Sequence, residues 1–225
     1  MTAVIEEDVQ VTIKALKANR FDPVEYVEKA ADVAKMVMAM IPPEAKVGMG
    51  GSASLSQLGI TEALMKRGNL TRTQPEVFLT SSNAITRDGK LVNTDMTGNR
   101  VSAMIFGPKL VIVVAGKNKI VKDLNAAFDR IKTVAAPAMA KIGGAKTPCA
   151  VEGGKCTDCK SPGRICTVTT IIEAKPRLTQ ISVVLVGEDV GLGWEPEWPE
   201  DRKNKIDSVF KESLRKQVTS RQARQ

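Results

Sequence analysis

The chain contains no histidine. This absence excludes a Ser–His or Cys–His nucleophile pair and any histidine metal ligand. Acid–base chemistry must then come from Asp, Glu, Lys, Cys or the single tyrosine, Tyr26. Aromatic residues make up only 4% of the 225 residues, which disfavours the base-stacking platforms of single-stranded nucleic-acid binders.

Long apolar runs are missing as well. No run approaches the roughly 18 residues that suggest a membrane-spanning helix. The N-terminal sequence MTAVIEEDVQ is acidic and lacks the apolar core of a signal peptide. We therefore expect a cytoplasmic protein that does not insert into a membrane.

The net charge of +8 is concentrated at the C-terminus. Residues 202–225 hold eight basic and two acidic residues, so the other 201 residues carry only +2. The basic character thus describes a tail, and we expect no nucleic-acid partner. Apolar residues of the tail recur at helical spacing, which predicts an amphipathic helix that packs on its own body or on a partner subunit, so a homo-oligomer is an open alternative. They are Ile206, Val209, Phe210 and Leu214.

Predicted helices and strands alternate along most of the chain. Helical spacing and capping residues predict helices over 6–19, 23–41, 55–68, 98–106 and 120–142, the last kinked or broken at Pro137. Apolar runs predict strands within 46–54 and over 76–80, 109–116, 167–174 and 180–187. The Asp88-Gly89 pair indicates a hairpin turn. The pattern predicts an α/β domain over 1–200, with a mainly parallel sheet flanked by helices, and a basic helical tail over 201–225.

All four cysteines lie in one loop, residues 147–166. Cys156 and Cys159 are separated by two residues, a spacing that lets both sulfurs face one ion, and Cys149 and Cys166 flank them at equal distance. Four thiolates suit tetrahedral zinc or an iron–sulfur cluster. The spacing matches neither a zinc ribbon nor a ferredoxin run. Reduced structural cysteines, or a redox disulfide between Cys156 and Cys159, are the alternatives.

Three polar segments follow predicted strands. The VGMGGSAS junction offers backbone N–H groups and a helix start to an anion, although a tight turn explains it equally well. Lys119 follows the strand 109–116, where it either binds an anion or is solvated. Glu188 follows the last strand, where it acts as a base or nucleophile or caps a turn. Lys119 and Glu188 are the candidate catalytic residues.

Several segments together resemble the LUD-domain family, in particular the lactate utilization protein C group. They are VGMGGSASLSQLGI, SSNAITRDGKLVNTDMTGNR, GPKLVIVVAGKNKIV and PCAVEGGKCTDCKSPGRICTVTTIIEAKP. The resemblance runs from about residue 20 to about residue 190 and leaves out the basic tail. It implies a fold similar to the ribose-5-phosphate isomerase, glucosamine-6-phosphate deaminase and CoA-transferase group.

The resemblance also implies a ligand site and a role. The site combines the glycine loop, the NAIT–DG–LVN segment with the polar residues after it, and the turn after strand 109–116. Its candidate residues are Gly50, Gly51, Ser52, Ser54, Asn83, Thr86, Gly89, Asn99, Arg100, Lys117, Asn118 and Lys119. The implied role is that of an accessory protein in oxidation of L-lactate to pyruvate, with a small anionic ligand and iron–sulfur oxidoreductase partners.

Two other functions remain open at this point. The strand-end Lys119 and Glu188, together with the implied fold group, allow a stand-alone enzyme that acts on a sugar phosphate or an acyl-CoA. The cysteine loop allows a redox-sensing regulatory module. Glu188→Gln would abolish turnover in the first case, and thiol oxidation would change partner affinity in the second.

Overall fold

The computed structural model describes residues 6–191, which form two sheets. Sheet A has five strands in the order β1-β9-β6-β3-β2, and all neighbours in it are parallel. The strands are β1 (Val24–Val27), β2 (Val47–Met49), β3 (Val77–Thr80), β6 (Leu110–Gly116) and β9 (Gln180–Val186). The predicted α/β class with a mainly parallel sheet is confirmed.

The central strands β6 and β9 are apolar along their length because both faces of sheet A are covered. Successive side chains of a strand point to opposite faces. In β6, Val111 and Val113 pack in one core cluster, while Ile112 and Val114 pack in another. β9 alternates in the same way, and its residues from Ile181 to Val186 are buried. Continuous apolar runs of this kind are typical of parallel strands covered on both faces.

Sheet B has four strands in the order β7-β4-β5-β8. They are β4 (Ala84–Thr86), β5 (Leu91–Asp95), β7 (Ile120–Val121) and β8 (Val168–Ile172). β4 and β5 form the antiparallel hairpin that the Asp88-Gly89 pair predicts. Gly89 takes a φ of +82°, a conformation that glycine adopts without strain.

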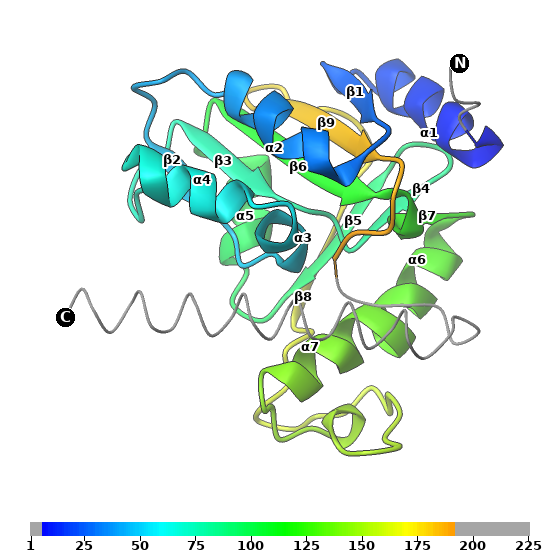
Figure 1. Ribbon diagram of the computed structural model, residues 1–225. Coiled ribbons are helices and arrows are strands. Elements are labelled where there is room, and N and C mark those ends of the chain that lie inside the picture. The colour runs from blue at the N-terminus through cyan, green and yellow to red at the C-terminus, as the bar shows by residue number, and fades with distance from the viewer. Residues whose placement is uncertain (1–5, 192–225) are drawn as a thin grey trace.

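Helices cover the two sheets in layers (Figure 1). They are α1 (Glu7–Ala18), α2 (Ala30–Ala39), α3 (Ala53–Gln57), α4 (Ile60–Arg67), α5 (Asn99–Ile105), α6 (Leu124–Arg130) and α7 (Ala136–Ile142), with a π-helical turn η2 (Ile131–Ala135) and the 3₁₀ turns η1 (Lys117–Lys119) and η3 (Pro148–Ala150). Apolar residues of α2, α3 and α4 pack on one face of sheet A. Residues of α1, α5 and sheet B pack on the other face. α6 and η2 cover the far side of sheet B through Ala127 and Ile131.

Residues 23–41 form a strand and a helix, so the prediction of one continuous helix there is wrong. β1 pairs in parallel with β9, and both Val24 and Val27 are buried. The helical spacing of apolar residues holds only from Ala30 onward. At the sheet edge, valine and tyrosine side chains suit a strand, and pairing with β9 decides the conformation.

Two further predicted helices are interrupted. The helix over 55–68 is divided into α3 and α4 by Gly59, whose φ is +71°. The helix over 120–142 starts later than predicted, because residues 120–121 form β7. Its predicted irregularity at Pro137 is present as the π-helical turn η2, which ends just before that proline. A proline has no N–H to donate to the preceding turn, so regular α-helical bonding fails there.

The predicted amphipathic tail, residues 201–225, lies outside the described residues. Within residues 6–191, no helix has both the length and the apolar character that crossing a membrane requires.

Candidate functional site

A cavity of about 530 Å³ lies where β2, β3 and β6 end. These strands are parallel neighbours, so their carboxyl ends meet at one edge of sheet A. Gly51 and Ser52 follow β2, residues 80–83 end or follow β3, and Lys119 follows β6; all line the cavity. Open parallel sheets bind ligands at this edge, and the volume is within the range of small-molecule sites.

Lys119 is a buried basic side chain of this cavity, with 6% of its surface exposed. Its Nζ donates hydrogen bonds to Ser54 Oγ at 2.8 Å and to Ser81 Oγ at 2.7 Å. The two hydroxyls are themselves 3.3 Å apart. Burial lowers the pKa of Lys119 well below its ordinary value, and the positive charges of Arg130 and Arg100 lower that pKa further.

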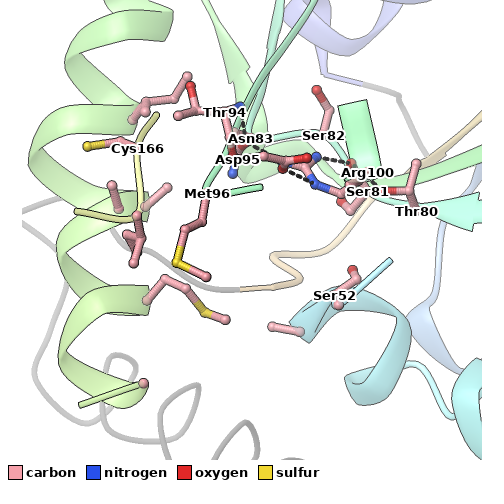
Figure 2. Close-up of a pocket in the computed structure, with 18 of the residues that line it drawn as sticks. Ser52, Thr80, Ser81, Ser82, Asn83, Thr94, Asp95, Met96, Arg100 and Cys166 are labelled. Atoms are coloured by element: carbon pink, nitrogen blue, oxygen red, sulfur yellow. Dashed lines mark hydrogen bonds and ion pairs between the residues drawn. The ribbon is translucent and has the colours of Figure 1, made fainter. Parts of the chain in front are cut away.

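Arg100 is a second cation on the cavity wall, and protein acceptors occupy its guanidinium group. Its Nε donates to Asp95 Oδ1 at 2.9 Å, and its other nitrogens donate to the Asn83 and Asn93 side chains and to backbone carbonyls. Asp95 also accepts from the backbone N–H of Val101 at 2.9 Å. Figure 2 shows this network at one side of the cavity. The arginine therefore holds the wall together.

Arg130, at the end of α6, is the third cation and is 4% exposed. It donates to the backbone carbonyls of Asn118 at 3.2 Å and Asn83 at 2.9 Å. Asn83 is therefore bound by both arginines, through its side chain to Arg100 and through its backbone to Arg130. Of the lining residues within the described range 6–191, Asp95 is the only acid, against three basic side chains.

The opposite wall is mainly apolar. It is built by η2 and α7 and by the end of the cysteine loop, through Ile131, Ala135, Met139, Ile165 and Cys166. Ser52 and Cys166 lie on opposite sides of the cavity, with Met96 between them (Figure 2). Irregular π-helical turns such as η2 are frequent at functional sites, because they change the direction in which a helix presents its side chains.

Six of the candidate ligand residues line this cavity: Gly51, Ser52, Ser54, Asn83, Arg100 and Lys119. Ser52 also caps α3, since its Oγ accepts from the Leu55 N–H. Lys119 is therefore the one candidate catalytic residue at the cavity.

Glu188, the other candidate catalytic residue, does not line the cavity. Its carboxylate accepts from the backbone N–H of Ala30 at 3.0 Å, at the start of α2. The carboxylate therefore caps the start of α2, not the turn after β9 that the sequence alternative named, and it does not take part in the cavity.

The remaining candidates have structural contacts outside the cavity lining. Lys117 forms an ion pair with Glu6, and the Asn118 side chain accepts from the Val190 N–H at 3.0 Å. Asn99 accepts a hydrogen bond from the Thr97 hydroxyl.

Thr86, Gly89 and Gly50 also have structural contacts. Thr86 bonds to Asp88 in the β4–β5 turn. Gly89 packs against the backbone of α1, and Gly50 donates its N–H to Leu79 O at 3.1 Å.

The four cysteines surround a second, small cavity of about 20 Å³. All four are partly exposed thiols, and no three His, Cys, Asp or Glu side chains within residues 6–191 are arranged to hold a metal ion. Arg164 organises the loop by donating to the carbonyls of Cys159 at 2.7 Å and Cys166 at 2.8 Å. Hydrogen bonding from Ser161 lowers the pKa of the Cys159 thiol. The sulfur donors suit a soft metal, but the loop as it stands is not a closed ligand set.

Sequence reasoning missed Arg130 and Ser81. Arg130 lies inside a predicted helix with no local sign of a ligand role. Ser81 follows β3 directly, so the rule that ligands bind at strand carboxyl ends could have found it.

Comparison with known proteins gives a family. The family model for the LUD domain matches residues 71–186, just over half of the chain. Among solved structures, a DUF162 family protein from Deinococcus radiodurans has the same fold, with a TM-score of 0.51 and 13% identity. That alignment covers 82% of this chain and 99% of the other. No curated protein matches.

The matched segment contains β3 to β9, the cysteine loop and Lys119, so it includes most of the cavity. The resemblance inferred from the four sequence segments is confirmed, and the family is linked in general to lactate utilization. The chain belongs to the LUD-domain family.

Proposed function

We propose that this protein is an accessory component of a lactate-oxidising system and that it binds a small carboxylate in the 530 Å³ cavity. One observation carries the proposal: among the described residues 6–191, three basic side chains, Lys119, Arg100 and Arg130, line the cavity against a single acid, Asp95. Such a cavity favours an anion. The family's general link to lactate utilization favours a hydroxy or oxo acid over other anions.

The charges differ in how far the protein already satisfies them. Asp95 neutralises Arg100, at 2.8 Å between Oδ1 and Nη2. Lys119 has serine hydroxyls as partners and forms no ion pair with any carboxylate in residues 6–191. A buried cation without an acid partner is costly. A bound carboxylate would supply the missing negative charge.

Calorimetric titration of the full chain with L-lactate, pyruvate and inorganic phosphate tests the proposal. We expect one of the two carboxylates to bind at one site per chain. Lys119→Met should weaken that binding by about tenfold or more, because a hydrogen bond to a charged group contributes roughly 1.5–3 kcal/mol.

Lys117→Met is the matched control. Lys117 is two residues away and pairs with Glu6 outside the cavity lining, so its removal should leave the affinity unchanged. Equal binding by wild type and Lys119→Met, or no carboxylate binding at all, would contradict the proposal. Preference for phosphate would instead favour the alternative of a stand-alone enzyme acting on a sugar phosphate.

We further propose that the cysteine loop is a thiolate site for zinc or an iron–sulfur cluster, which would serve electron transfer to iron–sulfur partner proteins or hold the loop in place. The support is that Cys149, Cys156, Cys159 and Cys166 surround one small cavity. The loop contains Gly153, Gly154 and Gly163, whose backbone freedom would let the chain bring the sulfurs together. Without metal, the thiols fit the alternative of a redox-sensing module.

Metal analysis and an absorption spectrum of anaerobically purified protein test this second proposal. Iron with visible absorption indicates electron transfer, and zinc indicates a structural site. Replacing both Cys156 and Cys159 by serine should release the metal and increase proteolysis between residues 147 and 166. Metal-free wild-type protein whose loop is already protease-resistant would rule the site out.

A further inference from the structure

Two serine hydroxyls surround the amine of Lys119. A neutral primary amine has two N–H bonds and one lone pair, whereas an ammonium group has three N–H bonds and no lone pair. Lys119 Nζ has two acceptors, Ser54 Oγ at 2.8 Å and Ser81 Oγ at 2.7 Å. The third position on the nitrogen has no protein acceptor within residues 6–191. The Lys119 side chain itself lines the cavity.

The surroundings of Lys119 disfavour a positive charge on it. Arg130 and Arg100 are its charged neighbours, and the one lining acid, Asp95, is already bound to Arg100. The Gly191 backbone also lies close to this amine, since a Cβ atom there would stand 2.8 Å from Nζ, and it contributes to the desolvation of Lys119. A desolvated amine beside other cations is a nucleophile at neutral pH.

We propose that Lys119 is a nucleophilic amine that forms a Schiff base with the carbonyl group of an oxo acid bound in the cavity. The proposal rests on the carboxylate site proposed above and specifies the substrate class. The cations attract the carboxylate, and the free position of Nζ meets the carbonyl carbon. A hydroxy acid would occupy the same cavity without reacting.

The reaction needs no further reagent. The Nζ lone pair attacks the carbonyl carbon, an N–C bond forms, and the C=O π electrons move to oxygen. The two amine hydrogens leave with that oxygen as water, and an imine remains. Ser54 and Ser81 contact Nζ directly and contact each other at 3.3 Å, so their hydroxyls can carry these protons to the departing oxygen.

The cavity also selects the size of the acid. At about 530 Å³ it is far larger than a three-carbon acid needs. Its wall opposite the cations is formed by apolar side chains that include Ile131, Met139 and Ile165. We therefore expect oxo acids with an aliphatic side chain to react more readily than pyruvate.

Reductive trapping tests the inference. The full chain is incubated at neutral pH with sodium cyanoborohydride and either pyruvate or 4-methyl-2-oxopentanoate, and adducts are located by peptide mass spectrometry. Lys119 should be labelled roughly 100-fold faster than surface lysines, which stay protonated with a pKa near 10.4. L-lactate should compete with labelling and leave no adduct. Ser54→Ala combined with Ser81→Ala should slow labelling by roughly 100-fold.

Lys119→Arg keeps a basic side chain at this position and removes the primary amine, so it should give no adduct in the cavity. Lys117→Arg is the matched control, and in this variant Lys119 should be labelled at the wild-type rate. If both acids bind by calorimetry but Lys119 stays unlabelled, or if label is spread evenly over surface lysines, the Schiff base is refuted and the binding site stands. If neither acid binds nor labels, the proposed function fails and the inference fails with it.

Discussion

Two buried basic side chains of this cavity, 19 residues apart in the sequence, differ in how far the protein compensates their charge. Arg100 is surrounded by acceptors and an acid, and its role is to fix the wall that Asn83, Asn93 and Asp95 form. Within residues 6–191, Lys119 has two hydroxyl partners and no acid, so a positive charge on it would be poorly compensated. The contrast separates a structural cation from one that is available for chemistry.

Arg100→Leu should lower the free energy of unfolding by about 3–5 kcal/mol, because it leaves Asp95 buried without its partner. Urea denaturation monitored by circular dichroism measures this loss. Arg87→Leu is the control, since Arg87 and Asp8 form an ion pair whose side chains are 46% and 49% exposed. Exposed pairs contribute roughly 0–1 kcal/mol. Similar losses in both variants would show that Arg100 is not structural.

Lys119→Met should raise the free energy of unfolding at neutral pH by about 0.5–2 kcal/mol, as replacements of strained functional residues often do. The pKa of Lys119 in the folded protein lies below its ordinary value of 10.5. At any pH between these two pKa values, the unfolded chain therefore binds more protons than the folded one. Wild-type stability therefore rises with pH through that window, and the advantage of methionine shrinks. Thermal unfolding from pH 7 to pH 10.5 measures it; a constant difference would contradict the assignment.

At the scale of elements, sequence periodicity identified those whose environment is uniform along their length. β6 and β9 are buried on both faces, and the β4–β5 hairpin has its own turn signal. Periodicity did not predict β1 and β7, because they are short strands whose conformation depends on partners more than 30 residues away. β1 pairs with β9, and β7 pairs with β4. Pairing of this kind leaves no local pattern in a sequence.

Gly89→Ala and Gly59→Ala should differ in cost although both glycines have positive φ, at +82° and +71°. A Cβ on Gly59 would meet open space, so only backbone strain of about 1–2 kcal/mol is expected. A Cβ on Gly89 would lie 2.7 Å from the Ala15 carbonyl carbon, and α1 would have to move off the hairpin. Urea denaturation should show the larger loss for Gly89→Ala; equal losses would mean that α1 yields freely.

At the scale of the whole molecule, the cavity lies between segments that are far apart in the sequence. One wall comes from the strand ends of sheet A and the other from η2, α7 and the cysteine loop. Periodicity predicted the strand ends and, with them, the glycine loop and Lys119, whereas the full set of candidates came from the resemblance to the LUD-domain family. Periodicity could not predict the second wall, because η2 and α7 carry no ligand motif and the cysteine loop predicts a separate metal site.

Cys166 should report on ligand binding, because it lines both the large cavity and the small cysteine cavity. A carboxylate or oxo acid in the large cavity should slow alkylation of Cys166 by N-ethylmaleimide, and alkylated protein should bind that acid more weakly, since coupling between two sites is reciprocal. Cys149, which lines only the small cavity, serves as the internal reference. Unchanged alkylation of Cys166 at saturating acid would mean that the two cavities are independent.

The strand order of sheet A has a consequence for synthesis on the ribosome. β9 comes last among the described strands, yet it lies between β1 and β6. Until residue 186 has emerged, β1 has no neighbour in the sheet, and only β2, β3 and β6 can pair. The nascent chain must therefore keep its N-terminal strand unpaired through most of translation, and insertion of β9 is the step that unites the two ends of the domain.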